Sequence, residues 1–410
     1  MKSLYQNKTL GGILLIAGTS IGAGMLALPI TTSSGGFFYA LMMILLCFGY
    51  MLISVFLLLE ANLYEPNIDS NIITMSKRRL GVVGAGVAWT SFLLLYYSVA
   101  AAYLSAGGSL VGQLLVGDKM LSHTEAHYTI IGFAIVVSAV VFFGAWLVDL
   151  INRFLMVGLI ATYLILSIFV TPHVEMANLE FGQAKYLLAA FPIVLLSFTS
   201  HTIVPSLRIY MQNDISKLKK ALLYGSLVPL LFYVVWELLI LGVLPMHGEF
   251  SLAEIAARPH PVSGLTHALK EHLGLFWVAS VVGAFSFFAL VTSFLGVVLC
   301  LVDFLADGLQ VTKNAKGRFC LLLLTMIPPL GFALYFPQGF MLAISYAGVF
   351  VAILYGILPP LMIWKARYQE KITCGFRVIG GKPVLLFSII GAVAVIILQI
   401  CAEMHWLPTP

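Results

Sequence analysis

Long apolar runs, separated by short polar or charged segments, occupy the chain from one end to the other. No Asp, Glu, Lys or Arg occurs between Lys8 and Glu60, Arg79 and Asp118, Glu271 and Asp303, or Arg318 and Lys365. Apolar runs of about 18 or more residues with almost no charge are typical of membrane-spanning helices. Boundaries at charged residues, proline and glycine predict about eleven of them, near 10–33, 37–62, 82–116, 128–148, 152–171, 184–206, 219–246, 273–307, 318–337, 340–363 and 383–406.

The composition agrees with an all-α polytopic membrane protein that forms a single membrane domain over residues 1–410. Hydrophobic residues make up 61% of the chain and charged residues only 10%, whereas soluble domains carry about 25% charged residues. The five cysteines show no Cys-x-x-Cys spacing and are read as small hydrophobic residues. No cofactor, metal site or nucleic-acid partner is predicted, although the net charge is +5.

The order of the basic residues predicts the orientation of the chain in the membrane. If the N-terminus is cytoplasmic, eighteen of the 22 Lys and Arg residues fall on the inside, as the positive-inside rule requires. The C-terminal tail then lies in the periplasm. The expected location is the bacterial inner membrane, which the chain crosses many times.

The first predicted span carries glycine where a continuous helix would not. Gly18, Gly22 and Gly24 surround the hydroxyls of Thr19 and Ser20, and each glycine disfavours helix by about 1 kcal/mol relative to alanine. These positions predict an interrupted helix. The alternative is close helix packing, because Gly18 and Gly22 also form a small-xxx-small pair.

The sixth predicted span shows a matching interruption. Pro192 and Pro205 bracket the polar segment 197–201 at mid-membrane depth, and unwound backbone is tolerated there only inside protein or beside a wet cavity. Helices 1–5 (10–172) and helices 6–10 (184–364) are therefore predicted to form an inverted repeat, with helix 11 (383–406) outside it. Paired interrupted helices point to a transporter site near the midplane.

The groups freed by such breaks suit an amino acid zwitterion. Backbone N–H groups at the start of the second half of span one lie at a positive helix end and can receive a carboxylate. Carbonyls beside both breaks can receive an ammonium, so neither role needs a charged side chain. The predicted substrate-binding residues at the breaks are Ala17, Gly18, Thr19, Ser20, Gly22, Ala23, Gly24, Ser197, Phe198, Thr199, Ser200 and His201.

Several segments resemble the hydroxy/aromatic amino acid permease family along essentially the whole chain. They are Ala17–Pro29, Leu57–Glu60, Asp149–Phe154, Phe198–Ser206, Thr292–Gly296, Asp303–Asp307, Pro328–Pro329, Tyr335–Pro337 and Tyr346–Gly348. The resemblance implies eleven helices, a leucine-transporter-like five-plus-five inverted repeat, and proton-driven uptake of an aromatic amino acid, with tyrosine as the first candidate.

One position departs from the family pattern and affects the coupling ion. Family members carry a lysine in span five, where this chain has Leu159, and such an amine can stand in for sodium. Glu237 lies well inside span seven, so it is predicted either to carry the proton or to make a structural hydrogen bond. Thr292 and Ser293 match a hydroxyl pair that helps to bind sodium in related folds, and back-bonding to their own helix is the alternative.

Three further side chains each have a functional and a structural reading. His201 could relay a proton, bind a substrate hydroxyl, or cap and support the site from behind. Tyr97 in span three and Phe288 in span eight could wall an aromatic pocket, although aromatic residues on membrane helices are more often packing residues.

The function that these features predict is ion-coupled symport of an aromatic amino acid, so the protein is not expected to be an enzyme. An intramembrane enzyme would need a second catalytic group beside Glu237, and a channel would need rings of like charge or filter loops. A sodium-coupled carrier, or a tryptophan, phenylalanine or hydroxy amino acid permease of the same fold, stays open as an alternative.

Overall fold

The computed structural model describes residues 8–68, 70–116, 123–180, 182–258, 261–274, 276–336 and 339–408, and within them the regular structure is entirely helical. Ten helices in these ranges are long and apolar enough to cross a membrane, or up to eleven when a bent pair near the N-terminus counts as one span. The predicted all-helical membrane protein with about eleven spans is thereby confirmed. Pro337, the last residue of the predicted ninth span, lies outside the described residues.

The spans follow the predicted order along the chain. They comprise α2 (Lys8–Ser20) with α3 (Ala23–Thr32), α4 (Phe37–Leu63), α5 (Ile72–Val116), α6 (His123–Phe142), α7 (Ala145–Val170), α9 (Phe191–Ser197) with α10 (Val204–Tyr210), α11 (Ile215–Val243), α14 (Phe276–Leu309), α15 (Ala315–Tyr335), α16 (Phe340–Val351) with α17 (Leu358–Trp364), and α18 (Gly381–Glu403). Short helical segments connect them: η1 (Ser33–Gly35), η2 (Thr171–His173), α8 (Met176–Glu180), η3 (Ala184–Ala190), η4 (His201–Ile203), α12 (Leu252–Ala257), α13 (Pro261–Leu273), and the π-helical η5 (Ala352–Ile357) and η6 (Lys365–Gln369).

Two predicted boundaries were wrong. The chain turns at Gly144, whose φ is +99°, so Asp149 lies on α7 with Arg153 and not in the predicted loop between 148 and 152. There they form an exposed ion pair at 2.9 Å. Residues four positions apart are neighbours on a helix surface, so the two charges are compatible with the helix. The third span begins at Ile72 instead of 82, because a charged first stretch continues through a kink at Gly81 with φ +75°.

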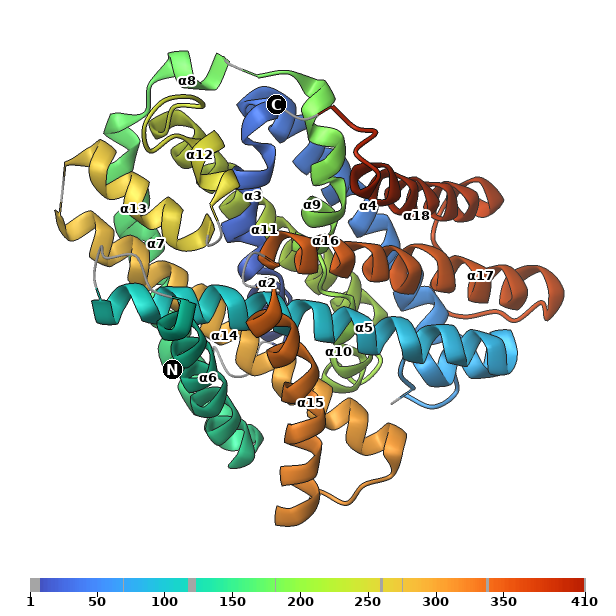
Figure 1. Cartoon of the computed structure of the whole chain (residues 1–410). Coiled ribbons are helices and arrows are strands. Elements are labelled where there is room, and N and C mark those ends of the chain that lie inside the picture. Colours follow the sequence, from blue (N-terminus) through green and yellow to red (C-terminus); the bar gives the residue numbers. More distant parts are fainter. Residues whose placement is uncertain are drawn as a thin grey trace.

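The interrupted helices lie at the centre of the bundle and the other spans surround them (Figure 1). α11 packs against α2, α3 and α4, while α9 packs against α3, α4 and α16. α5 and α14 contact one another and complete the enclosure. The connection between α11 and α14 folds into α12 and α13, which pack against α3 at one end of the molecule.

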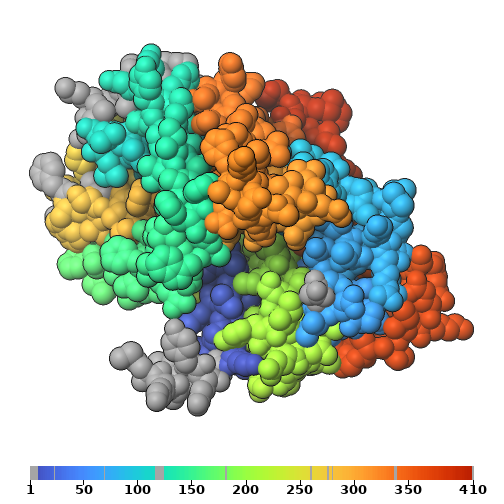
Figure 2. Space-filling model, turned by 90° about the horizontal axis from the view of Figure 1, so that it is seen from below, coloured from blue at the N-terminus to red at the C-terminus, as the bar shows by residue number. Residues whose placement is uncertain are grey.

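The opposite end of the molecule is hollowed. Figure 2 shows a recess bordered by green atoms of α7, orange atoms of α15 and yellow-green atoms of α10, with blue atoms of the first helices inside it. Gly296 of α14 is exposed, and nothing lies within 4 Å of a Cβ built on it. Ser293, one turn earlier on α14, bonds to the break in the first span, so this exposed position lies about one helical turn from a residue that contacts the break.

Buried ion pairs fasten the helix ends on the side of the molecule where α4 ends and α5 begins. Arg367 donates to Glu60 from Nε at 2.6 Å and from Nη2 at 2.5 Å, and the side chains are 2% and 0% exposed. The Val378 N–H also donates to Glu60, at 2.7 Å. The pair therefore joins α4 to η6 and to the segment that follows it.

A second group of contacts extends this fastening to the sixth span. Arg208 of α10 donates to the carbonyls of Asn62 at 2.5 Å and Glu65 at 3.2 Å. Arg79 of α5 pairs with Glu65 at 3.1 Å and also with Glu370. The second half of an interrupted helix is thus held to the end of α4 by charge-assisted hydrogen bonds.

We expect Glu60→Gln to lower the free energy of unfolding by about 3–5 kcal/mol, because it leaves the Arg367 charge buried without its partner. Denaturant titration of the purified protein in detergent measures the loss. Asp149→Asn breaks the exposed pair with Arg153 and is the matched control, with an expected cost below about 1 kcal/mol. Equal costs for the two variants would contradict a fastening role for the buried pair.

Candidate functional site

The first break separates α2 from α3, which are bent by 52° relative to one another. α2 ends at Ser20 and α3 begins at Ala23, with extended backbone at Gly22 (φ −167°, ψ −147°) and no side-chain cap. Thr19 and Ser20 donate their hydroxyls back to the Ile16 carbonyl, at 2.8 Å and 3.2 Å. The N–H groups that open α3 therefore have no capping side chain, and a helix start of this kind can receive an anion. The side chain of Ala23 lies outside the described residues.

The second break lies in the sixth span. α9 ends at Ser197, irregular backbone follows at Phe198–Ser200, and α10 starts at Val204 after the short η4. Proline occupies the first turn of both α9 and α10, where a missing N–H costs no helical hydrogen bond. The Thr199 hydroxyl is buried and has no hydrogen-bond partner among the described residues.

The two breaks touch one another. A Cβ placed on Gly24 would lie 2.5 Å from Ser197 Oγ and 3.0 Å from Ser197 Cα, so α3 and α9 approach closely only because residue 24 has no side chain. The Tyr233 hydroxyl of α11 lies between both breaks, 2.6 Å from the Ser20 carbonyl and 2.8 Å from the Ser197 carbonyl. Ser293 of α14 donates to the Ile21 carbonyl at 3.0 Å.

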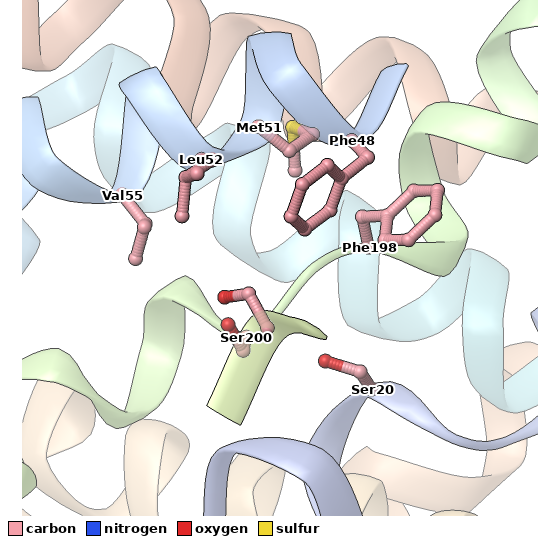
Figure 3. A pocket seen from close by; sticks show the side chains of 8 residues that line it. Ser20, Phe48, Met51, Leu52, Val55, Phe198 and Ser200 are labelled. Carbon is pink, nitrogen blue, oxygen red and sulfur yellow. The ribbon is translucent and has the colours of Figure 1, made fainter. Parts of the chain in front are cut away.

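A small cavity adjoins the two breaks. Figure 3 shows Ser20 and Ser200 pointing toward it, with Phe198 beside them and an apolar wall from α4 opposite. Ser226 of α11 completes the polar side. The α4 wall consists of Phe48, Met51, Leu52 and Val55. The cavity leaves room for about one water-sized group, bounded by hydroxyls on one side and by apolar side chains on the other.

His201 lies behind this cavity. Its Nε2 is 3.0 Å from the Ser54 hydroxyl, and its ring stacks on Tyr355 with centroids 4.5 Å apart. Ser54 donates its single proton to the Tyr355 carbonyl at 2.7 Å, so His201 must be the donor in the other bond. Nδ1 is therefore an acceptor, and it has no partner within the described residues.

The predicted aromatic residues of spans three and eight face other helices. The Tyr97 hydroxyl donates to the Leu324 carbonyl of α15 at 2.8 Å. The ring of Phe288 lies against Gly158 of α7, within 2.6 Å of a Cβ built there. Neither residue lines the cavity. Thr292 donates to the carbonyls of Phe288 and Ala289 on its own helix, at 2.8 Å and 3.1 Å, whereas Ser293 reaches the first break.

Glu237 lies near the end of α11 and is fully buried. Its Oε1 contacts the Thr32 hydroxyl at the end of α3, and its Oε2 has no hydrogen-bond partner among the described residues. The Thr32 hydroxyl is also 2.7 Å from the Leu28 carbonyl. Because a hydroxyl carries one proton, donation to Leu28 requires that Glu237 be protonated to donate in turn.

The sequence prediction missed Tyr233, Ser226 and the α4 wall. Tyr233 had one available signal, because it precedes Glu237 by four residues and so shares its helix face. The α4 residues had none, since apolar residues predominate on every face of that helix.

An all-helical, multi-pass membrane protein whose interrupted helices meet beside a small, half-polar cavity has the architecture of a transport protein. Comparison with known proteins identifies the family: residues 5–399 match the tryptophan/tyrosine permease family, and the chain belongs to it. It is therefore an aromatic amino acid permease and not an enzyme.

Three relatives illustrate the range of the similarity. The chain is 34% identical to the tyrosine-specific transport system 2 of Haemophilus influenzae, over 99% of both chains. It is 32% identical to the tryptophan-specific transport protein of the same species, over 97% of this chain and 96% of the relative. It is 31% identical to the low affinity tryptophan permease of Escherichia coli, over 94% of both.

Gly24→Leu should abolish substrate binding while the protein still inserts and purifies, because the new side chain pushes α3 away from Ser197. Gly22→Leu should do the same by overlapping Ser293 and Tyr103. Equilibrium binding of radiolabelled tyrosine to purified protein measures the effect. Gly132→Leu on α6 is the control, since nothing lies within 4 Å of its Cβ position. Normal binding by both break variants would rule out the carboxylate site at the start of α3.

Proposed function

We propose that the protein is a symporter that imports an aromatic amino acid, tyrosine first, across the bacterial cytoplasmic membrane with a proton gradient as the driving force. The observation that carries the proposal is the meeting of two interrupted helices whose freed backbone groups converge beside one cavity. The carboxylate is received at the N–H groups of Gly22, Ala23 and Gly24. The ammonium is received at the carbonyls beside both breaks.

The packing of the helices supports the proposed inverted repeat of 10–172 and 184–364. If spans one to five correspond in order to spans six to ten, the third matches the eighth and the fifth matches the tenth. α5 of the third span packs against α16 of the tenth, and α14 of the eighth packs against α7 of the fifth. By the same correspondence, the contact of α2 in the first span with α11 in the seventh matches the contact of α9 and α10 in the sixth span with α4 in the second. Five spans per half make the two halves opposite in orientation.

The proposed orientation places the N-terminus in the cytoplasm and the C-terminus in the periplasm. The hollowed face in Figure 2 is then cytoplasmic, since α2 begins there. The arginines that fasten α4, α5, α10 and η6 fall on the same side, in agreement with the positive-inside rule. The structure then corresponds to a state whose hollowed face is on the cytoplasmic side of the membrane.

Glu237 is the proposed proton carrier. Its carboxyl is removed from water, and one oxygen lacks a partner, so its charged form is disfavoured unless the surroundings rearrange. Thr32, its only neighbouring hydrogen-bond partner among the described residues, belongs to α3, whose other end forms the first break. Sodium is the second candidate ion, because Ser293 brings a hydroxyl to a break carbonyl, and hard cations require oxygen ligands.

Uptake into proteoliposomes should follow an imposed pH gradient and favour tyrosine over serine, alanine and leucine. The pH dependence is expected from Glu237, and the preference for an aromatic side chain is expected from the apolar wall that α4 presents to the cavity. Radiolabelled uptake is measured with each of the twenty amino acids as competitor, with pH and sodium gradients imposed separately. Uptake that follows sodium alone would refute proton coupling, and competition by serine as strong as by tyrosine would place the protein among hydroxy amino acid carriers.

Glu237→Gln should remove accumulation driven by the pH gradient yet leave exchange of internal for external substrate largely intact. Glutamine keeps the size of the side chain and a partner for Thr32 but carries no exchangeable charge. Both activities are followed in the same proteoliposomes. Glu271→Gln, at an exposed residue of α13, is the control and should behave as the unmodified protein. Accumulation by Glu237→Gln would contradict the proton role of this residue and favour sodium, for which Ser293→Ala, with Thr292→Ala beside it, is the test.

A further inference from the structure

The Tyr233 hydroxyl is placed between more acceptors than it can serve. It lies 2.6 Å from the Ser20 carbonyl and 2.8 Å from the Ser197 carbonyl. A phenol has one proton to donate. At any moment one of these two buried carbonyls therefore faces an oxygen with no proton between them, and a buried acceptor without a donor is costly.

One of these three oxygens belongs to Ser20, which lines the cavity, while Tyr233 contacts the lining residues Ser20 and Phe198 without lining the cavity itself. Ser20 and Phe198 both line the cavity, and the Tyr233 ring packs edge-on against Phe198, with centroids 5.1 Å apart at 63°. The cavity has room for about one water-sized group, and an ammonium is of similar size. An ammonium supplies three donors, enough to serve the carbonyl that the phenol leaves unserved and the phenol oxygen as well.

The opposite side of the first break is already filled. A Cβ on Gly22 would overlap Ser293 and lie 2.8 Å from the Tyr103 hydroxyl, and the Tyr103 ring packs on Phe294 with centroids 5.6 Å apart. The nearest carboxyl on the face of α11 that carries Tyr233 is Glu237, which contacts Thr32 instead. The oxygens available to a cation next to the cavity lining are therefore the neutral Tyr233 hydroxyl and the two carbonyls, not a carboxylate.

We propose that the Tyr233 hydroxyl, together with the carbonyls of Ser20 and Ser197, binds the ammonium group of the substrate. This assignment rests on the proposed transport of an amino acid and adds to it a side chain that contacts the substrate. Two carbonyl dipoles and a phenol attract a cation without leaving a charge buried when the site is empty. The same hydroxyl holds the two breaks together until the substrate arrives.

The test compares tyrosine with 3-(4-hydroxyphenyl)propionate, which keeps the ring and the carboxylate but has no ammonium. Binding of each to purified Tyr233→Phe is measured by calorimetry, with folding verified by size-exclusion elution. The affinity for tyrosine should fall about tenfold or more, as expected for a lost hydrogen bond to a charged group. The affinity for the propionate should change by less than about twofold, because the missing oxygen faces nothing in that ligand.

Tyr163→Phe is the matched control. That hydroxyl also bonds to a backbone carbonyl, that of Phe232 at 3.0 Å. Its ring packs on Phe232 and Phe285, neither of which lines the cavity, whereas Tyr233 packs on the lining residue Phe198. The variant should bind both ligands as the unmodified protein does.

Equal losses for the two ligands, or no loss for either, would overturn the assignment, since a purely structural hydroxyl cannot distinguish them. If Tyr233→Phe does not fold, a ring-fluorinated tyrosine at position 233 keeps the hydroxyl and weakens its oxygen as an acceptor. It should again lower the affinity for tyrosine alone, and failure to do so would also overturn the assignment. An unmodified protein that binds no aromatic amino acid would instead refute the proposed function.

Discussion

Backbone groups freed by a broken helix at membrane depth must be satisfied by neighbouring protein groups or by a wet cavity. At the first break, Thr19 and Ser20 return their hydroxyls to the Ile16 carbonyl. Ser293 serves Ile21 from α14, and Tyr233 serves Ser20 and Ser197 from α11. The helices that enclose the site are therefore held in place by hydrogen bonds to the breaks as well as by apolar packing.

Close approach of the breaks imposes a second requirement, which is small size. Gly24 lies where any Cβ would meet Ser197, and the contact lets one phenol span two helices. Around the cavity the side chains are large: Phe198 comes from the second break itself, and Phe48 and Met51 come from α4. A site that is polar at its backbone and apolar at its wall suits a ligand with a charged end and an aromatic end, as in the permease family to which the chain belongs.

The sequence predicted the spans and both breaks because their signals are local. Apolar length marks a span, and glycine, proline and hydroxyl residues in sequence mark Gly18–Gly24 and Ser197–His201. Long-range features left no such mark. Glu60 and Arg367 are 307 positions apart, and a helix on which apolar residues predominate on every face, such as α4, does not reveal which face meets the site. Aromatic character alone also left two readings for Tyr97 and Phe288, pocket wall or packing, and in the structure they contact α15 and α7.

In the proposed mechanism, coupling follows from the geometry of α11. Tyr233 and Glu237 lie one turn apart on one face of this helix, and both contact the first span: Tyr233 at the Ser20 carbonyl and Glu237 at Thr32. Substrate at the first contact and a proton at the second therefore act on the same interface between α11 and the α2–α3 pair. Two ligands become coupled when both bias one element between its two arrangements. An ammonium that takes the Tyr233 hydroxyl from a break carbonyl, and a proton that decides whether Glu237 donates to Thr32 or accepts from it, would both change how α3 is held.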